Sequence, residues 1–175
     1  MDKNGVYQLE GWRAFFIIPL SMIGQMEQVM RQGHCHCKSV CYEFGGSPLT
    51  CYACHCTDCQ SSTGSAFTLS MIVNQSDVTV IEGSVAVDGF SHNGADIERH
   101  HCESCGSVLW FSGKEYPGIL ALKPGSFDDT SWFSPVAHLW VRSKQPWLVL
   151  NSSIKQFEEQ PEMAELFGLW ESLNR

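Results

Sequence analysis

The sequence predicts a mainly β fold that ends in a short helix. Short apolar stretches recur through the middle of the chain, several of them with alternating apolar and polar side chains, and clusters of glycine, proline and serine separate them. Only the C-terminal end repeats apolar side chains at helical spacing. With 175 residues, 43% of them hydrophobic, the chain is long enough to bury the core of one domain.

Residues 1–30 differ in character from the rest of the chain. They contain no cysteine, and their apolar run, Ala14 to Ile23, is interrupted by Pro19. The run is shorter than the ~20 apolar residues needed to cross a bilayer. Asp2 and Glu10 do not fit the positively charged start of a secretory signal. We therefore expect residues 1–30 to be a helical or disordered extension, and residues 31–175 to form a single β domain.

The strand predictions come from alternation and from turn residues. Val40, Tyr42 and Phe44 alternate as one face of a strand, and a Gly-Gly-Ser-Pro turn follows. Two later stretches are predicted to form a hairpin that turns at Glu82 and Gly83. The predicted strands cover residues 40–44, 49–52, 66–73, 78–81, 85–90, 108–111, 118–123 and 137–141.

The C-terminal helix is predicted from its ends and its apolar stripe. Pro161 suits a first helical position, and glutamates around it suit the positive end of the helix dipole. Apolar side chains then recur at helical spacing at Met163, Leu166, Phe167 and Trp170. We expect this stripe to contact the core and to carry no cofactor.

The most informative stretch runs from Cys51 to Cys59 and contains four cysteines. Buried cysteines behave as small hydrophobes and have no packing reason to cluster, whereas a metal ion gives one. Disulfides fit poorly because neighbouring cysteines in so tight a loop rarely have the required geometry. Spacing alone leaves two options open: all four could close a local site, or Cys54, Cys56 and Cys59 could bind an ion that keeps one exchangeable position.

Two further cysteine pairs are far apart in the sequence. Cys35 and Cys37 form a C-x-C pair, and Cys102 and Cys105 form a C-x2-C pair followed by Gly106, where a metal knuckle needs positive φ. One ion bound by both pairs would make the closed four-thiolate site that is typical of structural zinc. The histidines are expected to be exposed, next to the ligands (His34, His36, His55, His100 and His101), or in the core (His138).

Charge and cysteine content restrict the partners. The formal charge is −8, and the eleven Lys and Arg residues are scattered, so nucleic acid and anionic membranes are poor partners and small molecules are favoured. Nine cysteines, an odd number, favour a reducing compartment, and we expect a cytoplasmic location.

These motifs together resemble the glutathione-dependent formaldehyde-activating enzyme family, which shares its domain with centromere protein V. The resemblance covers residues 33–160 and depends on pieces that occur in order: Gly33-His34-Cys35-His36-Cys37, Cys54-His55-Cys56-Thr57-Asp58-Cys59-Gln60, Cys102-Glu103-Ser104-Cys105-Gly106, Gly125-Ser126-Phe127-Asp128-Asp129, and His138-Leu139-Trp140. Lys38 departs from the family, which usually has glycine there.

The resemblance implies a fold of small, zinc-anchored β-sheets with two Zn²⁺ ions per chain. It implies structural zinc at Cys35, Cys37, Cys102 and Cys105, catalytic zinc at Cys54, Cys56 and Cys59, and no ligand role for Cys51. The implied activity is that of a carbon–sulfur lyase that condenses a thiol, glutathione, with a small aldehyde such as formaldehyde. Gln60 and Ser65 are candidates for binding the substrate. The alternative is a zinc-stabilised binding or scaffold module without catalysis.

Overall fold

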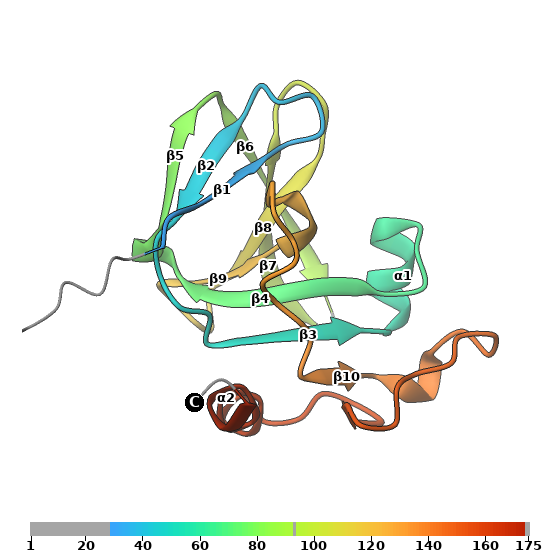
Figure 1. The fold of residues 1–175 in the computed structure, drawn as a ribbon. Coiled ribbons are helices and arrows are strands. Elements are labelled where there is room, and N and C mark those ends of the chain that lie inside the picture. The colour runs from blue at the N-terminus through green and yellow to red at the C-terminus, as the bar shows by residue number, and fades with distance from the viewer. Residues whose placement is uncertain (1–28, 93, 174–175) are drawn as a thin grey trace, which may run out of the picture.

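The computed structural model describes residues 29–92 and 94–173, and this part of the chain contains eleven strands in two sheets and two α-helices (Figure 1). The mainly β fold with a short C-terminal helix is therefore confirmed. The prediction for residues 1–30 concerns residues that lie almost wholly outside the described part of the chain.

The smaller sheet contains β1 (Arg31–His34), β2 (Cys41–Phe44) and β5 (Val78–Glu82), in the order β1-β2-β5. Both pairings are antiparallel. Val40, Tyr42 and Phe44 are fully buried, as their alternation predicted. Figure 1 shows this sheet stacked above strands β4 and β9 of the larger sheet.

The larger sheet has eight strands in the order β11-β10-β3-β4-β9-β8-β7-β6. The strand β10 runs parallel to both of its neighbours, and the other pairs are antiparallel. The strands are β3 (Thr50–Cys54), β4 (Thr68–Asn74), β6 (Val85–His92), β7 (Ala95–Cys102), β8 (Val108–Gly113), β9 (Ile119–Leu122), β10 (Ala137–Leu139) and β11 (Lys155–Gln156).

The helices are short. A helix of seven residues, α1 (Thr57–Thr63), follows β3, and α2 (Met163–Leu173) lies below β3 in Figure 1. The helix α2 starts two residues after Pro161 rather than at it. The described residues also contain three 3-10 helices: η2 (Gln75–Asp77), η3 (Pro124–Ser126) and η4 (Val141–Ser143).

The two faces of the larger sheet have different surroundings. One face packs against the smaller sheet, and its buried side chains include Met71, Val73, Leu109, Trp110, Leu120 and Leu122. On the other face, Leu166 of α2 packs in a second cluster together with Cys54, Cys56 and Cys59. The predicted apolar stripe of the C-terminal helix therefore contacts the core.

The predicted hairpin of residues 78–81 and 85–90 is wrong. The strand β5 pairs with β2, whereas β6 pairs with β7, so the turn at Gly83 connects two sheets instead of two paired strands. The partner of β6 was not predicted, because Ala95–Cys102 carries mostly polar side chains and lacks a clear apolar alternation.

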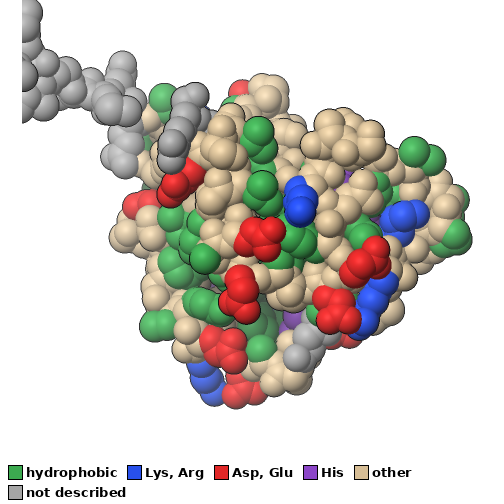
Figure 2. Space-filling view, turned by 90° about the horizontal axis from the view of Figure 1, so that it is seen from below, with side chains coloured by type: hydrophobic (Ala, Val, Ile, Leu, Met, Phe, Trp, Pro, Cys, Tyr) green, Lys and Arg blue, Asp and Glu red, His purple; other side chains and the backbone are tan. Residues whose placement is uncertain are grey.

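One face of the molecule carries several acidic side chains (Figure 2). Figure 2 shows acidic side chains spread over the face seen from below in Figure 1, and the basic ones among the described residues form no continuous surface there. In the part of the chain that the structure describes, no helix is long and apolar enough to span a membrane.

Candidate metal centres

Two groups of cysteines come together in space. Cys35, Cys37, Cys102 and Cys105 form one group, and Cys54, Cys56 and Cys59 form the other. In each group the Sγ atoms all lie within 4.8 Å of one another. In the first group, Cys35 and Cys37 lie in the β1–β2 turn, Cys102 ends β7 and Cys105 lies in the turn after it, so the group bridges the two sheets.

The spacing of the sulfurs in the four-cysteine group fits a tetrahedral ion. Four thiolates at about 2.3 Å from one zinc ion lie about 3.8 Å apart. Cys37 Sγ lies 3.5 Å from Cys35 Sγ and 3.8 Å from Cys102 Sγ. Cys35 and Cys102 are buried, while Cys37 and Cys105 are exposed. The donor set therefore fits the zinc ion that the family resemblance implies.

Both turns of this group use left-handed backbone. Gly106 has φ +72°, as its place after the C-x2-C pair predicted, and Lys38 has φ +62° in the turn after Cys37. This conformation favours glycine, which explains why glycine is usual at the Lys38 position in the family. The left-handed residue lets the chain fold back so that backbone N–H groups point at sulfur: Val40 N–H donates to Cys35 Sγ over 3.2 Å.

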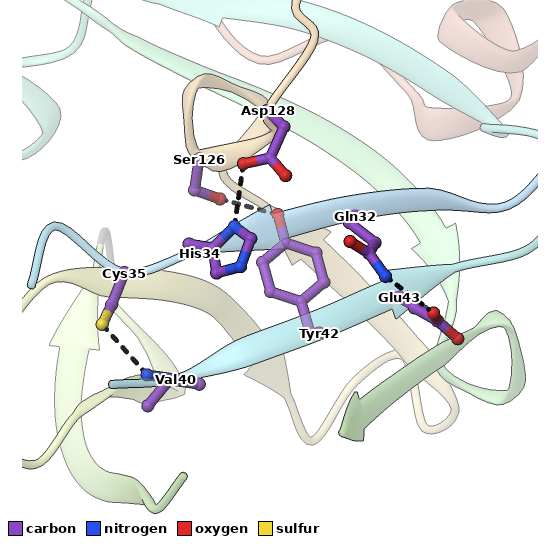
Figure 3. A network of polar contacts seen from close by, with 8 residues as sticks. All are labelled: Gln32, His34, Cys35, Val40, Tyr42, Glu43, Ser126 and Asp128. Atoms are coloured by element: carbon purple, nitrogen blue, oxygen red, sulfur yellow. Dashed lines mark hydrogen bonds and ion pairs between the residues drawn. The ribbon is translucent and has the colours of Figure 1, made fainter. Parts of the chain in front are cut away.

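Side chains near the first group connect strands β1 and β2 to the loop after β9 (Figure 3). His34 Nδ1 donates to Asp128 Oδ1 over 2.8 Å, and the Tyr42 hydroxyl lies 2.7 Å from Ser126 Oγ. Burial raises the pKa of Tyr42 above its usual value, so the phenol stays protonated. His34 is therefore engaged in holding this loop, next to the cysteine turn.

The three-cysteine group lies where β3 ends and α1 begins. Cys54 is the last residue of β3, Cys56 is the N-cap of α1, and Cys59 lies in its first turn. Cys56 Sγ accepts the backbone N–H of Cys59 over 3.3 Å, so the thiol takes the capping role that Ser or Asp usually has. All three cysteines are buried.

The pKa shifts of the three thiols indicate that the group needs a cation in order to ionise fully. Hydrogen bonds from Cys54 and Cys59 lower the pKa of Cys56 far below its usual range. The hydrogen bond with Cys56 raises the pKa of Cys54 to about 12, and hydrogen bonds with Cys54 and Cys56 raise that of Cys59 well above its usual value. Three thiolates therefore cannot form together unless a cation compensates them, and thiolates are ligands that Zn²⁺ prefers.

Cys51 and Cys41 belong to neither group. Cys51 is fully buried in the core between the sheets, and burial raises the pKa of its thiol to about 12. The next residue along β3, Tyr52, points to the opposite face of the sheet and packs in the second cluster with Cys54. Among the described residues, no cysteine, histidine or carboxylate completes the three-cysteine group as a fourth ligand within the same 4.8 Å limit.

His92 is a neighbour of the three-cysteine group that the sequence analysis missed. Its Nε2 lies 3.9 Å from Cys56 Sγ and its Nδ1 lies 3.8 Å from Asp58 Oδ2. The residue ends β6, a strand that the sequence placed in the wrong pairing. No local pattern could therefore have shown that His92 approaches residues 56–58.

The other site candidates have structural contacts. Gln60 Nε2 donates to the carbonyls of His55 (2.7 Å) and Ser143 (2.8 Å), and Gln60 Oε1 accepts from Gln145 (2.6 Å). Ser65 follows the helix C-cap and its backbone N–H donates to Thr63 Oγ1. Substrate binding by Gln60 and Ser65 stays a prediction, and the amide of Gln60 already holds the α1 loop against residues 143–145.

His55 turns away from the sulfurs on either side of it. Its Nε2 lies 3.0 Å from His138 Nδ1, and its ring packs against Phe67 with centroids 5.3 Å apart. His55 is fully buried and His138 is nearly so. Burial lowers the pKa of both imidazoles, which makes a neutral pair on the core side of the cysteine loop.

Comparison with known proteins identifies the family. A family model described as "Glutathione-dependent formaldehyde-activating enzyme" matches residues 30–143, which is more than half of the chain. The chain belongs to this family. The matched range contains all seven cysteines of the two groups, whereas α2 lies beyond it.

Individual relatives are distant. A Halomonas elongata protein named "Putative glutathione-dependent formaldehyde-activating enzyme" is 24% identical over 133 residues, which are 71% of this chain and 83% of that protein. The crystal structure of a Rhodobacter sphaeroides protein is 18% identical and superposes with a TM-score of 0.44 over 55% of this chain and 87% of the other. That structural likeness is too weak to bear on function.

Proposed function

We propose that this protein is a zinc-dependent enzyme of the carbon–sulfur lyase class that joins a thiol to a small aldehyde. Glutathione and formaldehyde are the substrates suggested by the family description and by the name of the Halomonas elongata relative. The observation that carries the proposal is the difference between the two cysteine groups: one offers four ligands and the other three. Three protein ligands and one exchangeable position are the arrangement of catalytic zinc sites.

In this proposal Cys54, Cys56 and Cys59 hold the catalytic ion. A bound Zn²⁺ supplies the positive charge that lets a thiol lose its proton at neutral pH. The chain supplies rigidity: Cys54 is fixed by its pairing with Thr68 in the sheet, and Cys56 and Cys59 by the first turn of α1. The burial of the three sulfurs excludes water from their side of the site.

The proposed reaction adds the thiol to the carbonyl group. A bond forms between the thiol sulfur and the carbonyl carbon, the carbonyl π bond breaks, and the thiol proton ends on the former carbonyl oxygen. The product is a hemithioacetal, and no oxidant or reductant is consumed. Among the described residues, His92 lies near both Cys56 and Asp58, and in this proposal the substrates would meet these polar side chains.

The first group is proposed to hold structural zinc. Its four cysteines come from the β1–β2 turn, the end of β7 and the turn after β7, and β1–β2 and β7 belong to different sheets. One ion bound there would connect the two sheets near the surface, where Cys37 and Cys105 are exposed. Few apolar side chains can connect the sheets at such an exposed point.

The test measures the addition directly. Exchange NMR with ¹³C-formaldehyde and glutathione reports the rate of hemithioacetal formation with and without protein. We expect the zinc-loaded protein to accelerate exchange at least about tenfold over the spontaneous reaction, and Cys56→Ser to lose that acceleration. Cys51→Ser is the matched control, because Cys51 lies outside both groups. Equal rates with and without the protein would contradict the proposed function.

A further inference from the structure

Lys123 places a positive charge on the same face of the larger sheet as the three-cysteine group. In the antiparallel register, Thr68 lies opposite Cys54, so their side chains project from the same face about 5 Å apart. Lys123 Nζ donates to Thr68 Oγ1 over 3.1 Å and to Ser70 Oγ, on the same face of β4, over 3.2 Å. One residue, Thr68, therefore separates the ammonium from the strand position of Cys54.

The groups in direct contact with the ammonium carry no charge. Besides the two hydroxyls, Nζ contacts the Leu69 carbonyl at 3.4 Å and lies 4.4 Å from the centroid of the Phe111 ring. In the described part of the chain, the ion pairs of lysine and arginine use Arg99, Lys114 and Arg142, and none uses Lys123. Its position is therefore fixed while its charge is not neutralised by a carboxylate.

Lys123 differs from an ordinary surface lysine because its ammonium is largely buried. Burial lowers the pKa of Lys123 to about 8, while the thiolates of Cys59 and Cys54 act in the opposite direction. At neutral pH most molecules therefore still carry the ammonium. An unneutralised cation held in a partly dry environment attracts an anion more strongly than an exposed lysine does.

A hollow opens beside Lys123. It measures about 280 Å³ and is lined by the start of β4 and by the turn after β9, through Phe67, Thr68, Leu69, Lys123, Pro124 and Gly125. The hollow continues from the lysine toward Phe67, whose ring packs against His55 of the cysteine loop. The hollow therefore borders the start of β4, the strand that pairs with β3 beside Cys54.

We propose that Lys123 and this hollow form the subsite for a carboxylate of the thiol substrate. The inference rests on the proposed function and extends it, because it makes the substrate an acidic thiol rather than any thiol. The overall charge of −8 would favour neutral or cationic thiols, so selection of an anion needs a local cation. Lys123 provides one at the site.

The experiment compares two thiols that differ only in their carboxylates. Calorimetry on the zinc-loaded protein, without aldehyde, measures binding of glutathione and of glutathione diethyl ester, which keeps the thiol. We expect the wild-type protein to bind glutathione about tenfold more tightly than the diester. Lys123→Gln, which keeps hydrogen-bond donors for Thr68 and Ser70, should remove this preference and leave diester binding within about twofold. Lys114→Gln, which removes an exposed lysine, should retain the preference.

The outcomes separate the subsite from the reaction. Equal binding of the two thiols by the wild-type protein would overturn the subsite without needing any variant, as would an unchanged preference in Lys123→Gln at full zinc content. If binding of glutathione depends on Lys123 but exchange with formaldehyde is not accelerated, the proposed function fails and the subsite stands. If exchange is accelerated and Lys123→Gln selects glutathione as before, the subsite fails and the function stands.

Discussion

At the scale of single residues, the buried imidazole pair makes a clear prediction. His55 Nε2 and His138 Nδ1 are 3.0 Å apart. One of these nitrogens must accept the hydrogen bond, so at least one of the two rings must be neutral. Burial lowers the pKa of both, and for His55 the second ring adds to this effect. We expect ¹⁵N NMR of labelled histidines to show both rings titrating below pH 6.5. A midpoint at or above 6.5 for either would contradict the contact.

The same shifts link stability to pH. Both folded-state pKa values lie below the usual value, so the unfolded chain binds more protons when the pH falls below 6.5. The pair therefore contributes less stability as the solution becomes more acidic. Replacing His138 with Gln should flatten this dependence between pH 7.5 and 5.5 in urea titrations of the zinc-loaded protein. An unchanged slope would show that other groups cause it.

Single residues also mark the limits of sequence reasoning. The two cysteine groups could be predicted, because short cysteine spacings have few explanations besides metal binding. Spacing alone left the role of Cys51 open, and only the family resemblance implied that it is not a ligand. Lys123 and His92 could not, because each reaches the site through pairing of distant strands. A hydrogen bond to β4 fixes the side chain of Lys123. The residues around Lys123 in the sequence give no sign that it lies near the cysteines.

At the scale of elements, the turn at Lys38 carries local strain. A side chain at φ +62° costs about 1 kcal/mol relative to glycine before the greater freedom of glycine in the unfolded chain is counted. We expect Lys38→Gly to raise the free energy of unfolding by up to about 1 kcal/mol, and Lys38→Ala to leave it within about 0.5 kcal/mol. Chemical denaturation at saturating zinc measures both. If the glycine variant were no more stable than the alanine variant, the backbone at Lys38 would not be strained.

The connection from β5 to β6 is tightly packed against the same turn. A Cβ atom on Gly83 would lie 2.0 Å from the Ser39 carbonyl oxygen, whereas one on Gly118, with nearly the same φ, would meet nothing within 4 Å. Both substitutions to alanine incur the left-handed penalty, but Gly83→Ala adds a backbone clash. We expect it to be less stable than Gly118→Ala by about 2 kcal/mol or more, measured by denaturation. Equal stabilities would show that the turn can move.

The elements also show why local patterns gave some strands and missed others. Strands with a clear apolar alternation, such as β2, could be predicted, because a strand with one buried face has a period of two. The helix α1 was missed, because its seven residues carry no apolar stripe and its N-cap is a cysteine instead of a usual capping residue. The pairing of β5 and β6 was wrong because a Gly-containing turn does not specify which strand lies beside which.

At the scale of the whole molecule, the two cysteine groups should have separable roles. Cys105 belongs to the group that bridges the sheets, whereas Cys56 belongs to the group at the end of β3. We expect Cys105→Ser to unfold or aggregate the protein, and Cys56→Ser to lose one zinc ion and keep the fold. Zinc content and circular dichroism on both variants measure this. Equal structural damage would mean that both groups are structural and would favour a scaffold role.

The most direct test of the central claim is anomalous scattering at the zinc edge from a crystal soaked with glutathione. The account predicts two zinc ions per chain, one bound by four cysteines and one by Cys54, Cys56 and Cys59, with the glutathione sulfur as the fourth ligand of the second ion. It would be contradicted if a protein side chain, such as the imidazole of His92, occupied that fourth position both with and without glutathione.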